Sequence, residues 1–273
     1  MPGAHGDAGH RGGRRRGAEH PPAPARRAIV REPHPHTRTM RSMPDELWVA
    51  NLGTVEYRAA YAIQQRVRDL RQAEQIPDAL LLVEHPPVYT RGKRTGPGEL
   101  PMGEDWYRAQ GIDVVDVDRG GRVTYHGPGQ LVGYPIMRTD DVLTFVRTME
   151  RALVAALADE GLSARVRTDE GPDYTGVWIE DRKIASIGIH ISRGVTTHGF
   201  AVNVQNDLQP FEWVVPCGLA GVRMTSLLRE TRRTGEILHC FRKRAAHRFA
   251  EAHGRRQRLV SGARLLGVDA LVA

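Results

Sequence analysis

Strand-like blocks dominate the middle of the chain, and their order limits the folds that it can adopt. Apolar runs with a period of two alternate with glycine-rich turns, whereas the three-to-four period of helices occurs mainly toward the ends. We expect strands at 47–51, 79–83, 112–117, 131–136, 177–180, 183–191 and 199–204, and helices at 55–70 (N-cap Thr54), 141–160 and 224–253, with a long loop at 84–101. This order favours an α+β (mixed α/β) fold with a largely antiparallel central sheet flanked by helices.

The formal charge of +7 is carried by the two ends of the chain. Residues 1–43 and 242–273 each carry a net charge of +6, so residues 44–241 carry −5. An acidic central region is a poor surface for polyanions, and we therefore disfavour binding to nucleic acid. A non-catalytic nucleic-acid-binding protein that uses its arginine-rich ends stays as the alternative.

The composition changes twice along the chain. Residues 1–43 are rich in Gly, Pro, Arg and His without apolar periodicity, which predicts a disordered extension. Alternatively, Met43 is the true start and the residues before it are dispensable. We expect one catalytic domain at 44–253, because 273 residues can bury one sizeable core, and a basic C-terminal tail at 254–273.

Cysteine usage and hydropathy exclude several classes of protein. The chain has two cysteines, Cys217 and Cys240, and neither lies in a CxxC pair or a histidine cluster, so we expect no disulfide framework and no metal site. No apolar run approaches the ~20 residues of a membrane span. The first forty residues also lack the apolar stretch of a secretory signal. We expect a cytoplasmic protein that does not bind membranes.

The segment RGGRVTYHGPGQ, from Arg119 to Gln130, is the most informative motif. Its glycines let the backbone approach a ligand closely and present N–H groups to it, and Arg, Tyr and His side chains are interleaved. It lacks the phosphate-loop pattern GxxxxGK[ST]. Taken alone, the segment is also compatible with a tight turn that is glycine-rich for folding reasons.

Two strand-like segments have an unusually small or polar face. In KIASIGIHI, Ser186 and Gly188 alternate with isoleucines and leave room against the backbone, and Lys183 opens the strand. The segment THGFAVNV repeats this with Gly199 and Ala201. The alternative for Lys183 is a solvated charge, and for the second segment ordinary core packing.

Cys217 is the candidate nucleophile of the chain. Pro216 and Gly218 bracket it in a turn before a helix, where a thiol can be partly exposed and near backbone N–H donors. The alternative is a buried, inert thiol, which is the role that we assign to Cys240.

Together these segments resemble the lipoyl(octanoyl) transferase family. RGGRVTYHGPGQLVGYPI, GVWIEDRKIASIGIHI, HGFAVNVQNDL and PCGL followed by TSL are similar to the blocks of that family in order and spacing, from about Leu47 to Leu228. The resemblance implies the mixed α/β catalytic domain of biotin and lipoate protein ligases. It also implies no cofactor.

The resemblance further implies roles for individual residues. Cys217 corresponds to the family's nucleophile and Lys183 to the lysine that lowers its pKa, while His85 matches a position near the site. The implied substrate-binding residues are Arg119, Gly120, Gly121, Arg122, Val123, Thr124, Tyr125, His126, Ser186, Ile187, Gly188, Gly199, Phe200 and Ala201. Phe200 replaces the family's usual leucine and could reshape the acyl pocket. Residues 220–223 also differ from the family's usual sequence between PCG and TSL.

The implied reaction is a step of lipoate biosynthesis. An octanoyl group passes from octanoyl-acyl carrier protein through a thioester on Cys217 to a lysine of a lipoyl domain of 2-oxoacid dehydrogenase complexes or of the glycine cleavage H protein. We expect Phe200 and the isoleucine-rich strand to wall the acyl slot. Arg91, Arg94, Arg119 and Arg122 are the expected docking charges for acidic partners. The alternative enzyme is an ATP-dependent lipoate or biotin ligase, which needs no nucleophilic cysteine.

Overall fold

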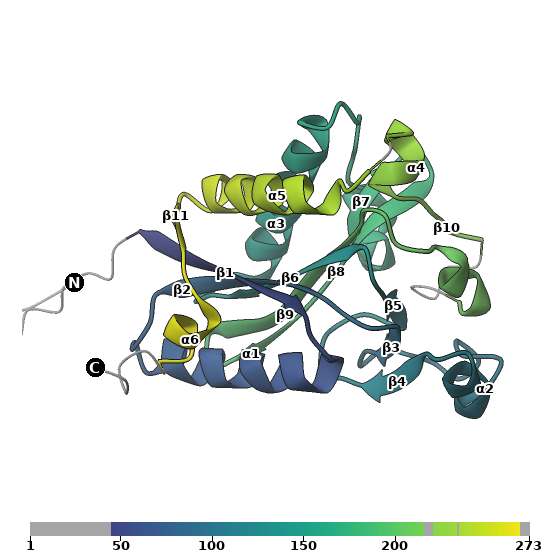
Figure 1. Cartoon of the computed structure of the whole chain (residues 1–273), viewed down its shortest axis with the longest axis horizontal. Coiled ribbons are helices and arrows are strands. Elements are labelled where there is room, and N and C mark those ends of the chain that lie inside the picture. The colour runs from purple at the N-terminus through teal and green to yellow at the C-terminus, as the bar shows by residue number, and fades with distance from the viewer. Residues whose placement is uncertain (1–44, 216–220, 234, 268–273) are drawn as a thin grey trace, which may run out of the picture. The chain divides into compact units, whose positions relative to one another are not determined.

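The main β-sheet joins strands from both ends of the chain in the computed structural model, which describes residues 45–215, 221–233 and 235–267 (Figure 1). Within these residues the sheet has eight strands, in the order β10-β8-β9-β6-β2-β1-β11, and β7 pairs with β8. Their bounds are β1 Glu46–Thr54, β2 Asp78–Glu84, β6 Gln130–Ile136, β7 Gly176–Ile179, β8 Arg182–Ser192, β9 Val195–Asn203, β10 Arg223–Met224 and β11 Arg256–Leu259. The succession β7-β8-β9-β6-β2 is antiparallel, whereas β1 is parallel to β2 and β11, and β10 to β8. The predicted mixed sheet with an antiparallel centre is confirmed.

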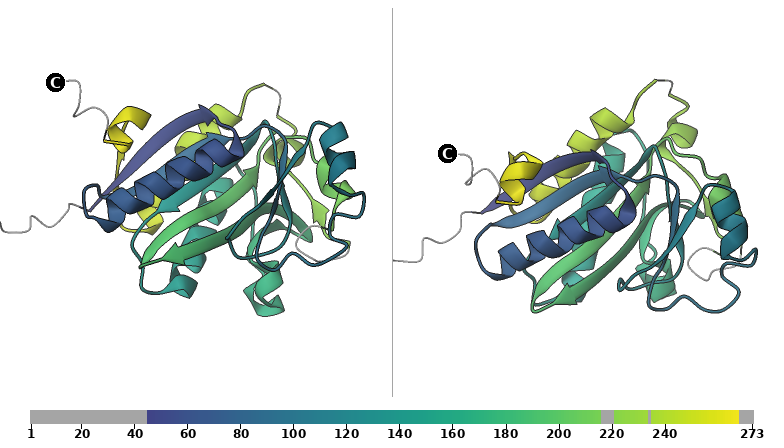
Figure 2. Two further views of the ribbon diagram at one scale, coloured as in Figure 1. Left: turned by 90° about the horizontal axis from the view of Figure 1, so that it is seen from below. Right: turned by 60° about the horizontal axis from the view of Figure 1, so that its bottom comes forward.

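Helices cover both faces of this sheet (Figures 1 and 2). One face carries α1 (Tyr57–Gln72) and the short α6 (Gly262–Leu265), and the other carries α3 (Val142–Ala158) and α5 (Leu238–Ala252). In β2, Leu80 and Leu82 pack on the α3/α5 side, while Leu81 and Val83 pack on the α1 side. Central strands are therefore apolar on both faces, which explains why β2 reads as a continuous apolar run.

A second, three-stranded sheet lies beside the main one. It has the order β4-β3-β5, with β3 at Val88–Arg91, β4 at Asp113–Asp116 and β5 at Thr124–His126, and α2 (Glu104–Ala109) packs nearby. A buried cluster that includes Tyr89, Tyr107, Tyr125 and Phe211 holds it together. β3 lies within the segment predicted as a loop. That prediction was wrong because a four-residue strand between prolines and glycines has too little periodicity, and its pairing with β4 and β5 is non-local.

The start of α1 also differs from the prediction. Thr54 is the last residue of β1 and not the N-cap, and the side chain of Glu56 accepts a hydrogen bond of 2.9 Å from the Ala59 N–H instead. Thr54 and Glu56 both carry a side-chain oxygen that could cap the helix. Thr54 does not do so because its pairing with Glu84 of β2 keeps it in the sheet. At α3 the side chain of Asp141 caps the helix by accepting a hydrogen bond from the Thr144 N–H at 3.0 Å.

The segment after residue 253 contributes to the fold in its described part. β11 pairs in parallel with β1, and Leu265 of α6 is buried against the α1 side of the sheet. In the region 224–253, which was predicted to be helical, the described helices are α4 (Leu227–Thr231) and α5. Short 3₁₀ helices lie earlier in the chain, at Thr168–Glu170, Pro172–Tyr174 and Gln209–Trp213. Residues 1–44, which include the predicted extension, lie outside the described residues. No described helix is long and apolar enough to cross a bilayer.

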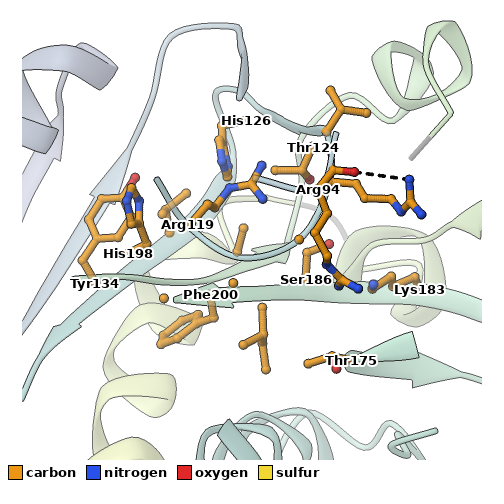
Figure 3. A pocket seen from close by; sticks show the side chains of 18 of the residues that line it. Arg94, Arg119, Thr124, His126, Tyr134, Thr175, Lys183, Ser186, His198 and Phe200 are labelled. Atoms are coloured by element: carbon orange, nitrogen blue, oxygen red, sulfur yellow. Dashed lines mark hydrogen bonds between the residues drawn. The ribbon is translucent and has the colours of Figure 1, made fainter. Parts of the chain in front are cut away.

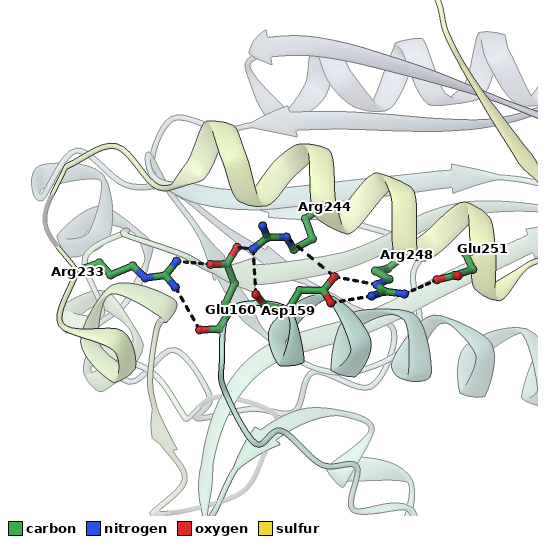
Figure 4. A network of polar contacts seen from close by, with 6 residues as sticks. All are labelled: Asp159, Glu160, Arg233, Arg244, Arg248 and Glu251. Carbon is green, nitrogen blue, oxygen red and sulfur yellow. Dashed lines mark hydrogen bonds and ion pairs between the residues drawn. The ribbon is translucent and has the colours of Figure 1, made fainter.

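Carboxylates at the end of α3 compensate the basic charge of α5 (Figure 4). Glu160, with its side chain 3% exposed, pairs with both Arg233 and Arg244. Arg248 donates two hydrogen bonds to Asp159, at 2.7 and 2.8 Å. Arg244 and Arg248 of the basic C-terminal region therefore stabilise the contact between these two helices.

Candidate active site

A bulge in β8 turns Lys183 toward the same face of the sheet as Ser186. In a regular strand, residues three positions apart point to opposite faces. Here Trp178 of β7 pairs with Lys183 and Val177 pairs with Ala185, so Ile184 is an extra residue in β8. Ile184 and Ala185 consequently both pack into the core on the α3/α5 side. The bulge leaves Lys183, which is 2% exposed, beside a pocket on the opposite face.

The floor of this pocket is formed by small residues of three neighbouring strands. Ser186 pairs with Ala201 and Gly188 with Gly199 across β8 and β9, and Val132 of β6 pairs with Ala201. All five residues line the pocket. Their small size keeps the floor close to the backbone and leaves space above it.

The glycine-rich segment predicted from the sequence forms the roof of the pocket (Figure 3). The Gly120 N–H donates to the Ile189 carbonyl at 2.9 Å, which fastens the roof to β8. A Cβ at Gly188 would lie only 2.8 Å from the Gly120 carbonyl oxygen, so glycine is required for this close approach. In β5, Thr124 and His126 face the pocket while Tyr125 packs into the core of the small sheet.

Arg119 fixes the roof to the small sheet. Its guanidinium donates to the backbone carbonyl of Thr90 at 2.8 Å and to the Thr90 hydroxyl at 2.7 Å. The residue is 8% exposed. Its expected role as a docking charge is therefore wrong, because its charge is directed into the protein.

Charged residues surround the mouth of the pocket beside Lys183. Arg94 forms an ion pair with Asp173 at 3.0 Å, and Arg122 pairs with Glu99 at 2.7 Å. Asp173, Arg94 and Arg122 all line the pocket. Arg91 is held by Asp116 and Glu104 at 2.7 and 2.6 Å. Arg94, with 47% of its side chain exposed, is the most accessible of the four predicted docking arginines.

Neutral histidines and tyrosines surround the far end of the pocket. Nδ1 of His85 lies 2.7 Å from the Val55 carbonyl oxygen, which can only accept, so Nδ1 carries the proton and Nε2 accepts from the Tyr134 hydroxyl at 2.7 Å. Burial lowers the pKa of His85 to about 4 and raises that of Tyr57 to about 12. Burial also holds the pKa of His126 well below its usual value, and its Nδ1 donates to the Gln130 side-chain oxygen at 2.8 Å.

His198 reaches this end of the pocket through an unusual backbone conformation. In a regular strand it would share a face with Phe200 and Val202, which pack on the α3/α5 side. Its φ of 57° instead lies in the left-handed region, and its N–H donates to the buried Gln64 side chain at 2.8 Å. Nε2 donates to Asp118 at 2.6 Å, and Nδ1 accepts from the Tyr57 hydroxyl at 3.4 Å. Burial lowers the pKa of His198, and hydrogen bonding by His198 lowers that of Asp118.

Comparisons with known proteins identify the family. Residues 56–247 match the model of the lipoyl protein ligase A/B catalytic domain. The chain belongs to this family. Octanoyltransferases of Mycobacterium avium (46% identity over 72% of this chain and 82% of the relative) and Acidothermus cellulolyticus (50% over 64% and 78%) are among its relatives. The chain is accordingly an acyltransferase, and its resemblance to the lipoyl(octanoyl) transferases is confirmed.

Solved lipoate ligases share the fold of this family member. The bipartite lipoate protein ligase of Thermoplasma acidophilum aligns with a TM-score of 0.62 at 19% identity, over 81% of this chain and 91% of that one. Lipoate-protein ligase A bound with ATP aligns with a TM-score of 0.59, also at 19% identity, over 82% and 93%. At this identity the comparison concerns the fold alone.

Most of the residues predicted for the site of this acyltransferase lie around the pocket beside Lys183. Lys183 and twelve of the fourteen predicted substrate-binding residues line it; Gly120 and Tyr125 do not. Cys217 lies outside the described residues. Cys240, expected to be buried, is exposed on α5 because it falls on the solvent side of that helix. No group of residues suited to a metal ion occurs in the part of the chain that the structure describes.

Several pocket residues were not predicted from the sequence. Tyr57 begins α1, Tyr134 lies within β6, and His198 lies in β9. The pocket is also lined by Val132, Pro172, Asp173 and Thr175, which were not predicted either. A histidine in the otherwise apolar segment THGFAV was the one available signal, since nothing in the local sequence of Tyr57 or Tyr134 distinguishes them from core tyrosines.

Proposed function

We propose that the chain transfers an octanoyl group from octanoyl-acyl carrier protein to a lysine of a lipoyl domain, through a thioester on Cys217. The acceptors would be the lipoyl domains of 2-oxoacid dehydrogenase complexes and the glycine cleavage H protein, in the cytoplasm. The names of the relatives support octanoyl as the acyl group. Donor, acceptor and covalent intermediate are part of the proposal.

In the first half-reaction the Cys217 thiolate attacks the carbonyl carbon of the donor thioester. A bond forms between the Cys217 sulfur and the acyl carbon, the donor C–S bond breaks, and the carrier thiolate leaves and takes up a proton from the Lys183 ammonium, which becomes neutral. A free thiol with a pKa of ~8.5 is mostly protonated at neutral pH, so the site must favour its anion. The ammonium of Lys183 supplies this stabilisation in the proposal.

In the second half-reaction the amine of the acceptor lysine attacks the Cys217 thioester. The new C–N bond replaces the C–S bond, Cys217 leaves as a thiolate, and the amine loses one proton. Lys183, in its neutral form, accepts that proton. The amide product is more stable than either thioester, which drives the transfer forward.

The contacts of Lys183 and of the chain on either side of residues 216–220 carry this proposal. The Val215 N–H donates to the Glu99 carbonyl at 3.0 Å, and the carboxylate of Glu99 holds the pocket residue Arg122. On the other side, the Thr225 N–H donates to the carbonyl of Lys183 itself at 3.0 Å. Both described flanks of the Cys217 segment are thus attached beside the mouth of the pocket, where Lys183 is buried.

An ATP-dependent ligase is the competing function, because solved structures with this fold include one bound with ATP. Such an enzyme would form an acyl-adenylate and would not depend on Cys217. The high identity to octanoyltransferases favours the transferase. Measuring mass gain on the acceptor with and without ATP separates the two: transfer from the loaded carrier without ATP supports the proposal, and a strict need for ATP contradicts it.

Intact-protein mass spectrometry tests the covalent intermediate. After incubation with octanoyl-loaded carrier protein, the wild type and Cys240→Ser should gain one octanoyl group, and Cys217→Ser should gain none. An undiminished adduct on Cys217→Ser would exclude this nucleophile. In a Cys240→Ser background, Lys183→Ala should move alkylation of Cys217 by iodoacetamide to higher pH by about one to three units. An unchanged pH profile would remove Lys183 from thiol activation.

A further inference from the structure

We propose that the buried rings of Tyr57, Tyr134 and His198 form an end wall that sets the longest acyl chain that the pocket accepts. This inference rests on the proposed function and adds to it the residues that determine acyl-chain specificity. None of the three was predicted as a site residue, and all three line the pocket.

The pocket has a direction that starts at Lys183. Lys183 opens the pocket-facing side of β8, and Ser186 and Gly188 follow along the same strand. After the bulge residue is discounted, Lys183 and Gly188 are four strand steps apart, which corresponds to roughly 13 Å. Gly188 pairs with Gly199 of β9, the residue next to His198. Figure 3 shows His198 and Tyr134 at the opposite side of the site from Lys183.

Apolar residues border the middle of this path beside Thr124 and His126 of β5, and the end of the path is closed. Val123, Val132 and Ala201 border the path between roof and floor. Tyr57 and Tyr134 are each 3% exposed and His198 is 1% exposed, so the wall does not open to solvent. An acyl chain that enters beside Lys183 would end with its methyl group against these rings.

The end wall is both neutral and rigid. The hydroxyls of Tyr134 and Tyr57 are engaged by His85 at 2.7 Å and His198 at 3.4 Å, and Asp118 holds the other side of His198. Because these polar atoms bond to one another, a methyl group at the wall leaves no new group unsatisfied. A chain with two further methylenes would have to break this network or displace buried rings.

The left-handed backbone of His198 is a second observation that points to the wall. A non-glycine residue at positive φ inside a strand costs free energy and persists where the surroundings enforce it. At His198 this conformation moves the ring from the α3/α5 side to the pocket side, where it meets Tyr57. The fold thus maintains a strained residue at the point where the wall is completed.

Phe200 is the rival determinant of chain length. It borders the pocket, but its ring packs against Phe249 of α5, with ring centroids 6.0 Å apart, and belongs to the core on the α3/α5 side. A Cβ at Gly133 would lie 2.2 Å from that ring, so Phe200 fills the space left by a glycine beneath the floor. We therefore expect Phe200 to support the floor of the path and not to end it.

A competition between two donors tests the end wall. The full-length enzyme is given equal amounts of octanoyl- and decanoyl-loaded carrier protein with one apo lipoyl domain, and the ratio of the two products is read by mass spectrometry. This ratio does not depend on how much enzyme is folded, because both donors compete for the same active molecules. Tyr57→Leu should raise the ratio of decanoyl to octanoyl product by up to about 15-fold if two methylenes each contribute about fourfold.

Two control variants separate the wall from its rival. Tyr57→Phe keeps the ring and should keep the wild-type ratio, and Phe200→Leu should do the same. An unchanged ratio in Tyr57→Leu, or a shift in Phe200→Leu alone, would overturn the end wall while leaving the octanoyl transfer of the wild type intact. A wild type that transfers neither acyl group would instead refute the proposed function, and the end wall with it.

Discussion

Substitution of Gly188 by alanine tests whether the roof of the pocket must lie directly on β8. The new Cβ would be 2.8 Å from the Gly120 carbonyl oxygen, whereas ordinary contact begins at 3.4 Å, so the roof must rise by about 0.6 Å. The obstacle is backbone, which cannot rotate away as a side chain can. Overpacking of this kind costs ~1–3 kcal/mol. Loss of the 2.9 Å hydrogen bond from Gly120 to Ile189 would add ~0.5–1.5 kcal/mol.

Gly262→Ala is the matched control for this variant. Its Cβ would lie 3.5 Å from a methyl group of Leu52, which is ordinary contact, at the first residue of α6. Urea denaturation should show a lower free energy of unfolding for Gly188→Ala by ~1.5–4.5 kcal/mol and no loss for Gly262→Ala. Octanoyl transfer should fall only in Gly188→Ala, because Arg119 and Gly121 move with the roof. If the two variants behaved alike in both assays, the close contact between roof and strand would not be a requirement of this fold.

Two further perturbations concern stability. Glu160→Ala removes the buried carboxylate that Arg233 and Arg244 share, and it should lower the free energy of unfolding by ~1–3 kcal/mol, since both arginines still reach water. Glu251→Ala, which removes an exposed partner of Arg248, should change the free energy of unfolding little. Equal effects of the two substitutions would contradict the role of burial. Burial lowers the pKa of His253 to about 4, so the unfolded chain binds a proton that the folded protein does not, and stability should fall as the pH drops from ~6.5 toward that value. His253→Phe, which keeps a ring against Phe249, should flatten this pH dependence of the unfolding free energy by up to ~1.4 kcal/mol per pH unit; an unchanged slope would show that His253 does not titrate in this range.

The candidate site was largely predictable where its residues follow one another in the sequence. The roof, RGGRVTYHGPGQ, could be found because glycine-rich segments with interleaved polar residues are typical of backbone contacts to ligands. Even there, the sequence could not separate Thr124 and His126, which face the pocket, from Tyr125, which does not. That distinction depends on the pairing of β5 with β3, which is a non-local contact.

The end of the pocket could not be predicted from local patterns. Tyr57, Tyr134 and His198 come from a helix, a central strand and the neighbouring strand, and their sequence neighbourhoods resemble ordinary core. The neutral state of the histidines also depends on burial and on partners that can be distant in the sequence, such as Val55, which lies 30 positions from His85. Hydrogen-bond networks of this kind are assembled by folding.

The sequence by itself determined the fold class, most of the strands and the identity of the acyltransferase family. Blocks of period-two hydrophobicity and the spacing of motifs are local properties of the sequence, so they can be recognised without knowing which strands pair with one another. The tertiary structure decided which face each residue occupies: the bulge at Ile184 turns Lys183 into the pocket, and the left-handed His198 crosses to the same side. It also paired β11 with β1 at the edge of the sheet, because a short, polar edge strand gains its order from its neighbour and not from its own composition.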